Sequence, residues 1–329
     1  MKDILIATLV SFFITLIAGY LLIPALKKLK MGQPILSYVK EHEGKAGTPT
    51  MGGIFFLIGM GLTCLFFFKS DSKLAIISLS ITAGYGIVGF LDDFIKVKFK
   101  KNLGLRAYQK IIFQLSLAII ASYFAYLNST ELVVPFINKT IDLGWFIIPF
   151  SIFVFLAVTN GVNLTDGLDG LASGTTFVYT AFFSVLIVYA GTVLNLSGRI
   201  NQFNEYYNLA VLTLSCTGAL LAFMFFNFYP AKIFMGDTGA LALGGLLASL
   251  AVFTEFTLFV PIMGIMFMVS CISVIIQVLY FKVTKGKRVF LMAPYHHHLQ
   301  HKGIAESKIS IIYMIITALS CLLVVIFYI

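Results

Sequence analysis

The sequence predicts an all-α, polytopic integral membrane protein that forms a single domain over residues 1–329. Of its 329 residues, 59% are hydrophobic and only 11% are charged, and the mean hydropathy is +0.97. A soluble domain carries about 25% charged and 45–50% apolar residues, so this composition excludes a water-soluble protein. Repeated apolar runs of about 20 residues, the length that crosses the hydrocarbon core of a bilayer, indicate transmembrane helices.

Ten such runs stand between charged or turn-rich segments, and we expect a transmembrane helix from each. They cover residues 3–23, 51–68, 74–91, 111–127, 145–161, 172–190, 208–228, 239–254, 257–281 and 309–328. The first run is longer than the 7–15-residue core of a signal peptide, so we expect it to be retained. The weakest boundary is Thr254-Glu255-Phe256, where we expect a tight turn between the eighth and ninth helices.

Basic residues favour one side of this map. The chain has 23 Lys and Arg against 14 Asp and Glu, a formal net charge of +9. Most of the basic residues fall after the first, third, seventh and ninth runs, so the positive-inside rule predicts that these loops are cytoplasmic and that both termini lie outside. In a soluble protein such an excess would suggest nucleic acid as a partner. Here acids interrupt the basic loops and apolar runs follow them, so we expect no nucleic-acid partner.

Three acidic motifs fall at the predicted cytoplasmic boundary. They contain Asp92 and Asp93 at the end of the third run, Asn163, Asp166, Gly167, Asp169 and Gly170 after the fifth run, and Asp237 at the start of the eighth run. If the 166–169 segment is helical, its spacing of three residues puts both carboxylates on one face. A solvated helix end is the structural alternative for the Asp92-Asp93 pair, and a helix cap is the alternative for Asp237.

A histidine cluster, His296-His297-His298 with His301, stands in the last predicted cytoplasmic loop. A zinc site, hydrogen bonding toward phosphate and an incidental polar loop are its three interpretations. No cysteine accompanies the histidines, and the nearby Lys and Arg would repel a cation. We therefore favour hydrogen bonding toward phosphate.

All of these groups are predicted to share one membrane face. A cleft at that boundary avoids the cost of about 2.5–3.5 kcal/mol for an Asp at the bilayer centre. Carboxylates among Lys and Arg suit a phosphate-bearing substrate with Mg²⁺ between, and because Mg²⁺ takes one or two carboxylates, we expect the others to orient substrate groups or lysines. A transporter is the rival from another class, but coupled transporters place their ion sites near the bilayer midplane.

The motifs resemble the polyprenyl-phosphate N-acetylhexosamine-1-phosphate transferases, and within them the phospho-N-acetylmuramoyl-pentapeptide-transferase branch. The resemblance runs from Pro24 to Lys308 and includes, in order, Lys45–Gly53, Asp92-Asp93, Gly104-Leu105 with Lys110 and Gln114, Asn163–Gly170, Pro230–Gly239 and Met292–His298. One small departure is Ala240, where a serine is common. The Ala-Pro-x-His-His-His run favours this branch over the sister enzymes that use UDP-GlcNAc for teichoic acid or O-antigen.

The resemblance implies transfer of phospho-MurNAc-pentapeptide from UDP to undecaprenyl phosphate with Mg²⁺, giving lipid I and UMP in peptidoglycan synthesis. The implied partners are UDP-MurNAc-pentapeptide, undecaprenyl phosphate and the lipid bilayer, and a homodimer is compatible with it. The implied location is the bacterial plasma (inner) membrane, with the active site facing the cytoplasm. We also expect a helix-lined groove open to lipid near the third, fifth and ninth spans.

The resemblance also implies roles for single residues. Asp237 is the principal Mg²⁺ ligand, and the catalytic set is Asp92, Asp93, Lys96, Asp237 and His296. The substrate-binding set is Lys45, Lys110, Asn163, Asp166, Gly167, Leu168, Asp169, Asn227, Phe234, His297 and His298. A phosphate monoester has a second pKa near 6, so the lipid phosphate is mostly dianionic without a base. We therefore expect Asp92 to orient that phosphate in a direct displacement, with an aspartyl-phosphate intermediate as the rival mechanism.

Overall fold

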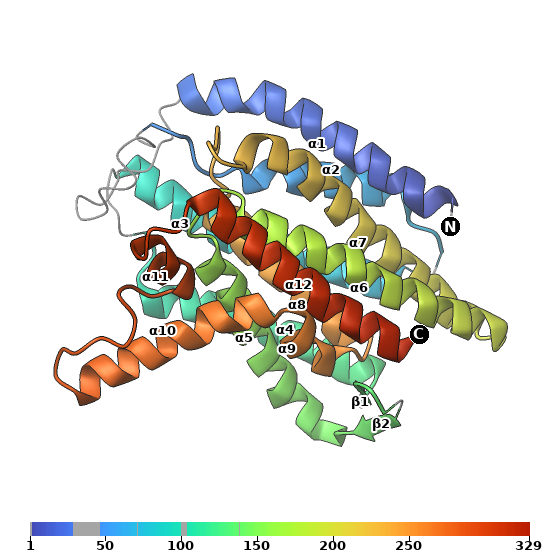
Figure 1. The fold of residues 1–329 in the computed structure, drawn as a ribbon. Helices are drawn as coiled ribbons and strands as arrows, with labels where there is room; N and C mark the ends of the chain where they lie inside the picture. Colours follow the sequence, from blue (N-terminus) through green and yellow to red (C-terminus); the bar gives the residue numbers. More distant parts are fainter. Residues whose placement is uncertain (1, 29–46, 71, 100–103, 138) are drawn as a thin grey trace.

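The computed structural model describes residues 2–28, 47–70, 72–99, 104–137 and 139–329, and these residues are mostly helical (Figure 1). The helices are α1 Lys2–Lys28, α2 Gly53–Phe67, α3 Lys73–Lys98, α4 Ala107–Asn128, α5 Ile147–Thr165, α6 Leu171–Leu196, α7 Ile200–Asn227, α8 Gly236–Phe253, α9 Val260–Met263, α10 Ile265–Val283, α11 Tyr295–His301 and α12 Glu306–Tyr328. Within the described residues, nine helices are long and apolar enough to cross a membrane, and α2 is a shorter apolar helix. The predicted all-α membrane fold is confirmed.

Helix α8 forms the centre of the bundle. Along the apolar stretch of α8, 94% of the residues are buried, whereas 22% are buried along the apolar stretch of α10. The glycine and alanine residues of α8 allow neighbouring helices to approach it closely. Helices in a membrane associate by such close packing rather than by the hydrophobic effect. Gly89 of α3 shows how close the packing is, since a methyl group there would overlap the backbone carbonyl of Asp237 in α8. The first turn of α8 therefore lies directly against the last turns of α3.

The ninth predicted span is not one helix, so the expectation of a single helix over residues 257–281 was wrong. The structure divides this segment into η3, a 3₁₀ helix over Thr257–Phe259, then α9 and α10. Pro261 stands in the first turn of α9, and Gly264 ends the helix with φ −94° and ψ 27°. A side chain at Gly264 would bring its Cβ within 2.9 Å of the Val260 carbonyl, so the missing Cβ permits the turn. Beyond it, α10 runs away from the rest of the bundle (Figure 1).

A short hairpin stands outside the helical bundle. Strands β1 (Glu131–Val134) and β2 (Lys139–Asp142) pair antiparallel, and the 3₁₀ helix η2 (Gly144–Phe146) follows them. The N–H of Val133 donates to the carbonyl of Glu255, at 2.9 Å. Glu255 has φ +66°, so the tight turn predicted at Thr254–Phe256 is confirmed. The strands were not predicted, because a four-residue strand gives no signal in a search for long apolar runs.

Both ends of the described chain lie at one end of the bundle, and α11 lies at the opposite end (Figure 1). The histidine cluster was expected in a loop, but it forms this short helix instead. Pro294 precedes the helix in an extended conformation, which suits a proline at a helix start. The last turns of α3 and the first turn of α8 lie at the same end as α11, and there the site is built.

Candidate active site

A pocket of about 300 Å³ opens where α3 and α5 end and α8 begins. Its lining contains nine residues predicted from the sequence, namely Lys96, Asn163, Asp166, Gly167, Leu168, Asp169, Asn227, Phe234 and Asp237. Thr50, Met235 and Gly236 complete it and were not predicted. Lys45 lies outside the described residues. The three acidic motifs, far apart in the sequence, therefore meet at one site.

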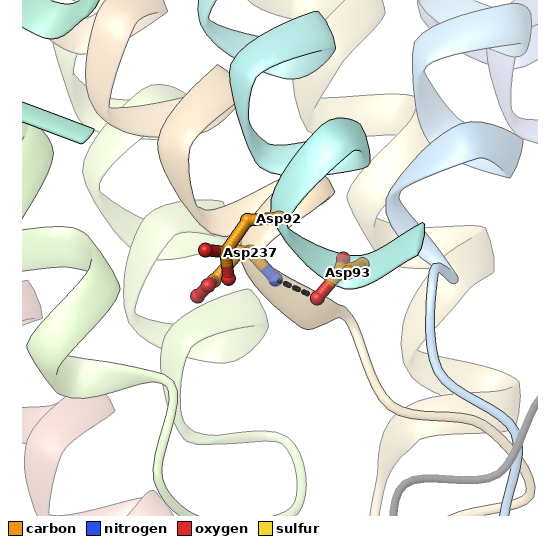
Figure 2. A group of neighbouring side chains, drawn as sticks. All are labelled: Asp92, Asp93 and Asp237. Atoms are coloured by element: carbon orange, nitrogen blue, oxygen red, sulfur yellow. Dashed lines mark hydrogen bonds between the residues drawn. The ribbon is translucent and has the colours of Figure 1, made fainter. Parts of the chain in front are cut away.

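Three neighbouring carboxylates form what we call the charged wall of this site, and of the three Asp237 lines the pocket itself. Asp92 and Asp93 stand on the last turns of α3, and Asp237 stands on the first turn of α8 (Figure 2). One oxygen from each of the three lies within 4.8 Å of the others. Asp92 is 2% exposed, which excludes a solvated helix end.

Asp93 holds the first turn of α8. Its Oδ1 accepts from the N–H of Asp237 at 3.2 Å, the bond drawn in Figure 2. Its Oδ2 accepts from the N–H of Thr238 at 2.9 Å and from the Thr238 hydroxyl at 2.7 Å. A carboxylate is favoured at the N-terminus of a helix, where backbone N–H groups lack partners in their own helix. Asp93 is therefore a cap supplied from α3, and it fixes the backbone that carries Asp237.

Two lysines neutralise the other two carboxylates. The Nζ of Lys96 lies 2.6 Å from Oδ2 of Asp92 and 2.8 Å from Oδ2 of Asp237. The Nζ of Lys110, on α4, lies 2.8 Å from the same Asp237 oxygen and 3.9 Å from Oδ2 of Asp92. Buried charges need such partners to offset the loss of hydration. The carboxylate of Asp237 thus pairs with lysines of other helices, which does not match the helix-cap alternative.

The donor set fits a hard cation. Carboxylate oxygens are the ligands that Mg²⁺ prefers, and among the described residues Asp92, Asp93 and Asp237 are the group whose spacing suits a metal ion. Both carboxylate oxygens of Asp93 accept hydrogen bonds from the backbone of α8. Oδ1 of Asp92 accepts from the N–H of Leu105 at 2.8 Å. The oxygens that face the lysines, on Asp92 and Asp237, are therefore the ones placed to bind a cation.

The loop after α5 forms the opposite wall. Helix α5 ends at Thr165 and residues 166–170 form turns, so the helical arrangement considered for Asp166 and Asp169 is wrong. Gly170 has φ +73°, a left-handed conformation that glycine adopts without strain. Burial, and then the neighbouring carboxylates of Asp237 and Asp93, raise the pKa of Asp166 to about 8. We call residues 166–170 the nucleotide loop, after the substrate-binding role that the resemblance implies for them.

The segment from α7 to α8 closes the pocket. Asn227 donates from its amide nitrogen to the carbonyl of Ile233 at 3.0 Å and accepts from the Ser173 hydroxyl at 2.7 Å. Oδ2 of Asp169 accepts from the N–H of Ala231 at 2.9 Å. These bonds join the end of α7, the nucleotide loop and α6, and they leave Phe234 on the pocket lining.

The histidines of α11 lie beside the nucleotide loop. His296 is fully buried, and neither ring nitrogen has a hydrogen-bond partner within the described residues. Burial, and then the neighbouring His297, hold the pKa of His296 well below its usual value. A methyl group on Gly167 would overlap the His296 ring, so the absence of a side chain there lets α11 pack on the loop.

Two of the other three histidines of α11 make local hydrogen bonds. Nδ1 of His297 lies 3.1 Å from Oε1 of Gln300, and Nδ1 of His298 accepts from the N–H of Leu291 at 3.1 Å. Where the chain is described, the histidines form no group with the spacing of a metal site, which does not support the zinc interpretation.

An apolar groove of about 570 Å³ lies along the side of the bundle. Residues of α5, such as Phe153 and Ala157, form one wall, and residues of α9 and α10, such as Pro261, Phe267 and Ile272, form the other. The expected groove therefore adjoins the fifth and ninth predicted spans, and α3 does not line it.

Two supporting residues were missed by sequence reasoning. Glu306 and Ser310 of α12 hydrogen-bond the backbone of Asp169 from more than a hundred positions along the chain. Neither belongs to a motif with a recognised spacing, so no local signal could have found them. Thr238, in contrast, stands inside the Gly236–Gly239 motif, and its place beside Asp237 gave a usable hint.

Comparison with known proteins assigns a family. Residues 75–255 match the model described as Glycosyl transferase family 4, and residues 45–57 match phospho-N-acetylmuramoyl-pentapeptide-transferase signature 1. The phospho-N-acetylmuramoyl-pentapeptide-transferase of Thermoanaerobacter sp. (strain X514) is 44% identical over 326 residues, 98% of each chain. Proteins of the same name from Caldanaerobacter subterraneus subsp. tengcongensis and Clostridium novyi are each 43% identical, over 97% and 98% of this chain and 96% of their own. The chain therefore belongs to the phospho-N-acetylmuramoyl-pentapeptide-transferase family, within glycosyl transferase family 4.

Proposed function

We propose that this protein transfers phospho-MurNAc-pentapeptide from UDP-MurNAc-pentapeptide to undecaprenyl phosphate, with lipid I and UMP as products. The observation that carries the proposal is the group of Asp92, Asp93 and Asp237, paired with Lys96 and Lys110 at one end of a membrane bundle. A cytosolic nucleotide and a membrane lipid can meet only at such a boundary. The positive-inside rule supports a cytoplasmic position for this end, in a bacterial plasma membrane, and a homodimer stays a prediction.

In this proposal Mg²⁺ is held by Asp237 and Asp92. When bound, the cation would neutralise the phosphate charge that develops during transfer. Lys96 and Lys110 now contact the same carboxylate oxygens, so they are placed to move onto phosphate oxygens when a cation takes those ligands. Asp93 keeps Asp237 in position through the backbone of α8.

The acceptor phosphate would lie near Asp92. Phosphoryl transfer depends mainly on positioning and charge neutralisation rather than on covalent chemistry by the protein. Oδ1 of Asp92 is held by the N–H of Leu105, and Oδ2 faces the position proposed for the cation, so Asp92 is better suited to orient the phosphate through the cation than to act as a nucleophile. We therefore favour a single direct displacement. Inversion at phosphorus, measured with a chiral phosphate substrate, is the expected result, and retention would support an aspartyl-phosphate instead.

The nucleotide would lie against the nucleotide loop. Gly167, Leu168 and Asp169, together with Phe234, form a wall that suits the uridine ring. Asn163, Asp166 and Asn227 supply polar groups on the same lining. We assign Lys45, His296, His297 and His298 to interactions with the phosphates and the sugar of the donor substrate.

The lipid tail would occupy the apolar groove beside α5 and α10. Its lining residues are almost all hydrophobic, among them Phe153, Phe267 and Ile272, and the groove is large enough for several isoprene units. The hydrocarbon tail of the lipid would pack in this groove without polar partners, whereas the phosphate of the lipid would need the two lysines beside the charged wall.

The proposal is tested by lipid I formation in detergent, with Mg²⁺ present or chelated. We expect chelation to abolish product and Asp237→Asn to lower the rate at least about a hundredfold, because charge stabilisation of the transition state is worth several kcal/mol. Asp142→Asn, an exposed carboxylate in the hairpin, is the matched control and should keep full activity. Full activity of Asp237→Asn would contradict the metal-ligand assignment.

A second candidate is transfer of GlcNAc-1-phosphate from UDP-GlcNAc, as in sister enzymes of the superfamily. Offering the purified protein each UDP-sugar with undecaprenyl phosphate distinguishes the two functions. We expect turnover of UDP-MurNAc-pentapeptide, and turnover of UDP-GlcNAc alone would reverse the assignment.

A further inference from the structure

Helix α12 begins beside the nucleotide loop and hydrogen-bonds both the backbone N–H and the backbone carbonyl of one loop residue, Asp169. Oε1 of Glu306, the first residue of α12, accepts from the N–H of Asp169 at 2.5 Å. One turn further along, the hydroxyl of Ser310 donates to the carbonyl of Asp169 at 3.0 Å. The backbone of one pocket residue is thus fixed by two side chains of a helix 137 positions away.

This contact supplies what the loop cannot supply for itself. Residues 166–170 form turns and contain two glycines, so no regular hydrogen-bond ladder holds their backbone. Ser310 is fully buried and Asp169 is 3% exposed, so the Ser310 bond is shielded from water, and the bond of the half-buried Glu306 is partly shielded. A carboxylate acceptor also makes a stronger hydrogen bond than a neutral one.

Apolar packing supports the same contact. Leu168 and Leu171, at the two ends of Asp169's turn, belong to a small hydrophobic cluster with Ile309 and Tyr313 of α12. This cluster is separate from the large core of the bundle. Tyr313 also faces the ring of His296, at 6.3 Å between ring centroids. The start of α12 therefore touches both the nucleotide loop and the histidine helix.

We propose that Glu306 and Ser310 are positioning residues that set the shape of the nucleotide loop for the uridine nucleotide. They act through the backbone N–H and the backbone carbonyl of Asp169, and neither lines the pocket. The proposal rests on the proposed function, because it takes this loop as the uridine wall. It places the determinant of nucleotide affinity partly on the last helix, outside every motif of the sequence.

The test measures UMP binding by calorimetry and steady-state kinetics for each substrate. We expect Glu306→Ala to weaken UMP binding and raise the KM for UDP-MurNAc-pentapeptide about tenfold, as residues that orient direct ligands usually do. Ser310→Ala should give a smaller change in the same direction. Glu306→Gln should lie between wild type and Glu306→Ala, because the amide oxygen still accepts from Asp169.

The KM for undecaprenyl phosphate should stay unchanged in all three variants. Since both side chains hold the backbone of one residue, Asp169, the effects of Glu306→Ala and Ser310→Ala should not add in the double variant. Ser320→Ala is the matched control on the same helix, because its hydroxyl bonds only a neighbouring carbonyl, that of Thr317. Glu131→Ala, in the hairpin, is the control for loss of a carboxylate.

Glu306→Gln and Ser310→Ala keep side-chain shape, so they separate positioning from a failure to fold. Unchanged UMP affinity in both, or an equal rise in the KM for both substrates, would overturn the proposal. If wild type neither binds UMP nor turns over UDP-MurNAc-pentapeptide, the proposed function fails instead. The two failures are therefore distinguishable.

Discussion

The carboxylates of Asp92, Asp93 and Asp237 stand on two helices whose backbones touch, whereas the nucleotide loop is held by two side chains of α12 and by the backbone N–H of Ala231. In the first region, the position of each carboxylate follows from the packing of α3 against α8. In the second, turns take their shape from Glu306, Ser310 and Ala231. The charged wall is thus fixed by the packing of the helical bundle itself, and the nucleotide loop is attached beside it. Disturbing the two walls should give different kinetic and stability signatures.

The largest effect on activity is expected from removing a positive charge beside the charged wall. Lys96→Met leaves two buried carboxylates with one lysine, so we expect activity to fall about a hundredfold, as for loss of one charge-stabilising group. Lys98→Met on the same helix is the control, because that side chain lies over aromatic rings at the surface. Product formation in detergent measures both. Equal activity of the two variants would remove Lys96 from the site.

The seam between α3 and α8 is tested by Gly89→Ala. The added methyl group meets the backbone carbonyl of Asp237, so we expect a loss of about 1–3 kcal/mol in unfolding free energy together with a fall in activity. Gly61→Ala in α2 is the control, because nothing lies within 4 Å of the new Cβ. Thermal unfolding in detergent checks both. If Gly89→Ala unfolds at the wild-type temperature, the two helices are not in backbone contact.

The smallest effect concerns the nucleotide side and depends on pH. Burial keeps His296 neutral when folded, whereas an unfolded histidine binds a proton below about pH 6.5. As pH falls below that value, the unfolded state therefore gains a proton that the folded state does not. Unfolding free energy should then drop by up to about 1.4 kcal/mol per pH unit. His296→Asn should show a shallower drop between pH 7 and 5.5, and identical slopes would contradict the burial of a neutral imidazole.

The three carboxylates of the charged wall could be predicted from the sequence, whereas the residues that hold the site in place could not. Asp92, Asp93 and Asp237 sit in short polar motifs at the ends of apolar runs, and charge that close to a bilayer is costly unless it has a partner. Their common side followed from the distribution of lysines. The capping role of Asp93 could not be predicted, because it depends on the contact between α3 and α8. Likewise, Glu306 is an ordinary first-turn acid in the sequence.

The same limit applies to the fold. Hydropathy located the long helices, because length and apolarity are summed over many residues. The break at Gly264 was missed, because the apolar run continues through Pro261 and Gly264 without a charged residue. The hairpin and α11 are too short to leave such a pattern, although α11 brings His296 against the nucleotide loop.

The claim that the acids of α3 and α8 hold a divalent cation is tested most directly by binding of Mn²⁺, followed by electron paramagnetic resonance on purified protein in detergent. We predict that the wild-type protein binds Mn²⁺ in competition with Mg²⁺, and that Asp237→Asn lowers the affinity at least about tenfold. Asp142→Asn should bind as the wild type does. Equal Mn²⁺ affinity in the wild type and in Asp237→Asn would contradict the claim.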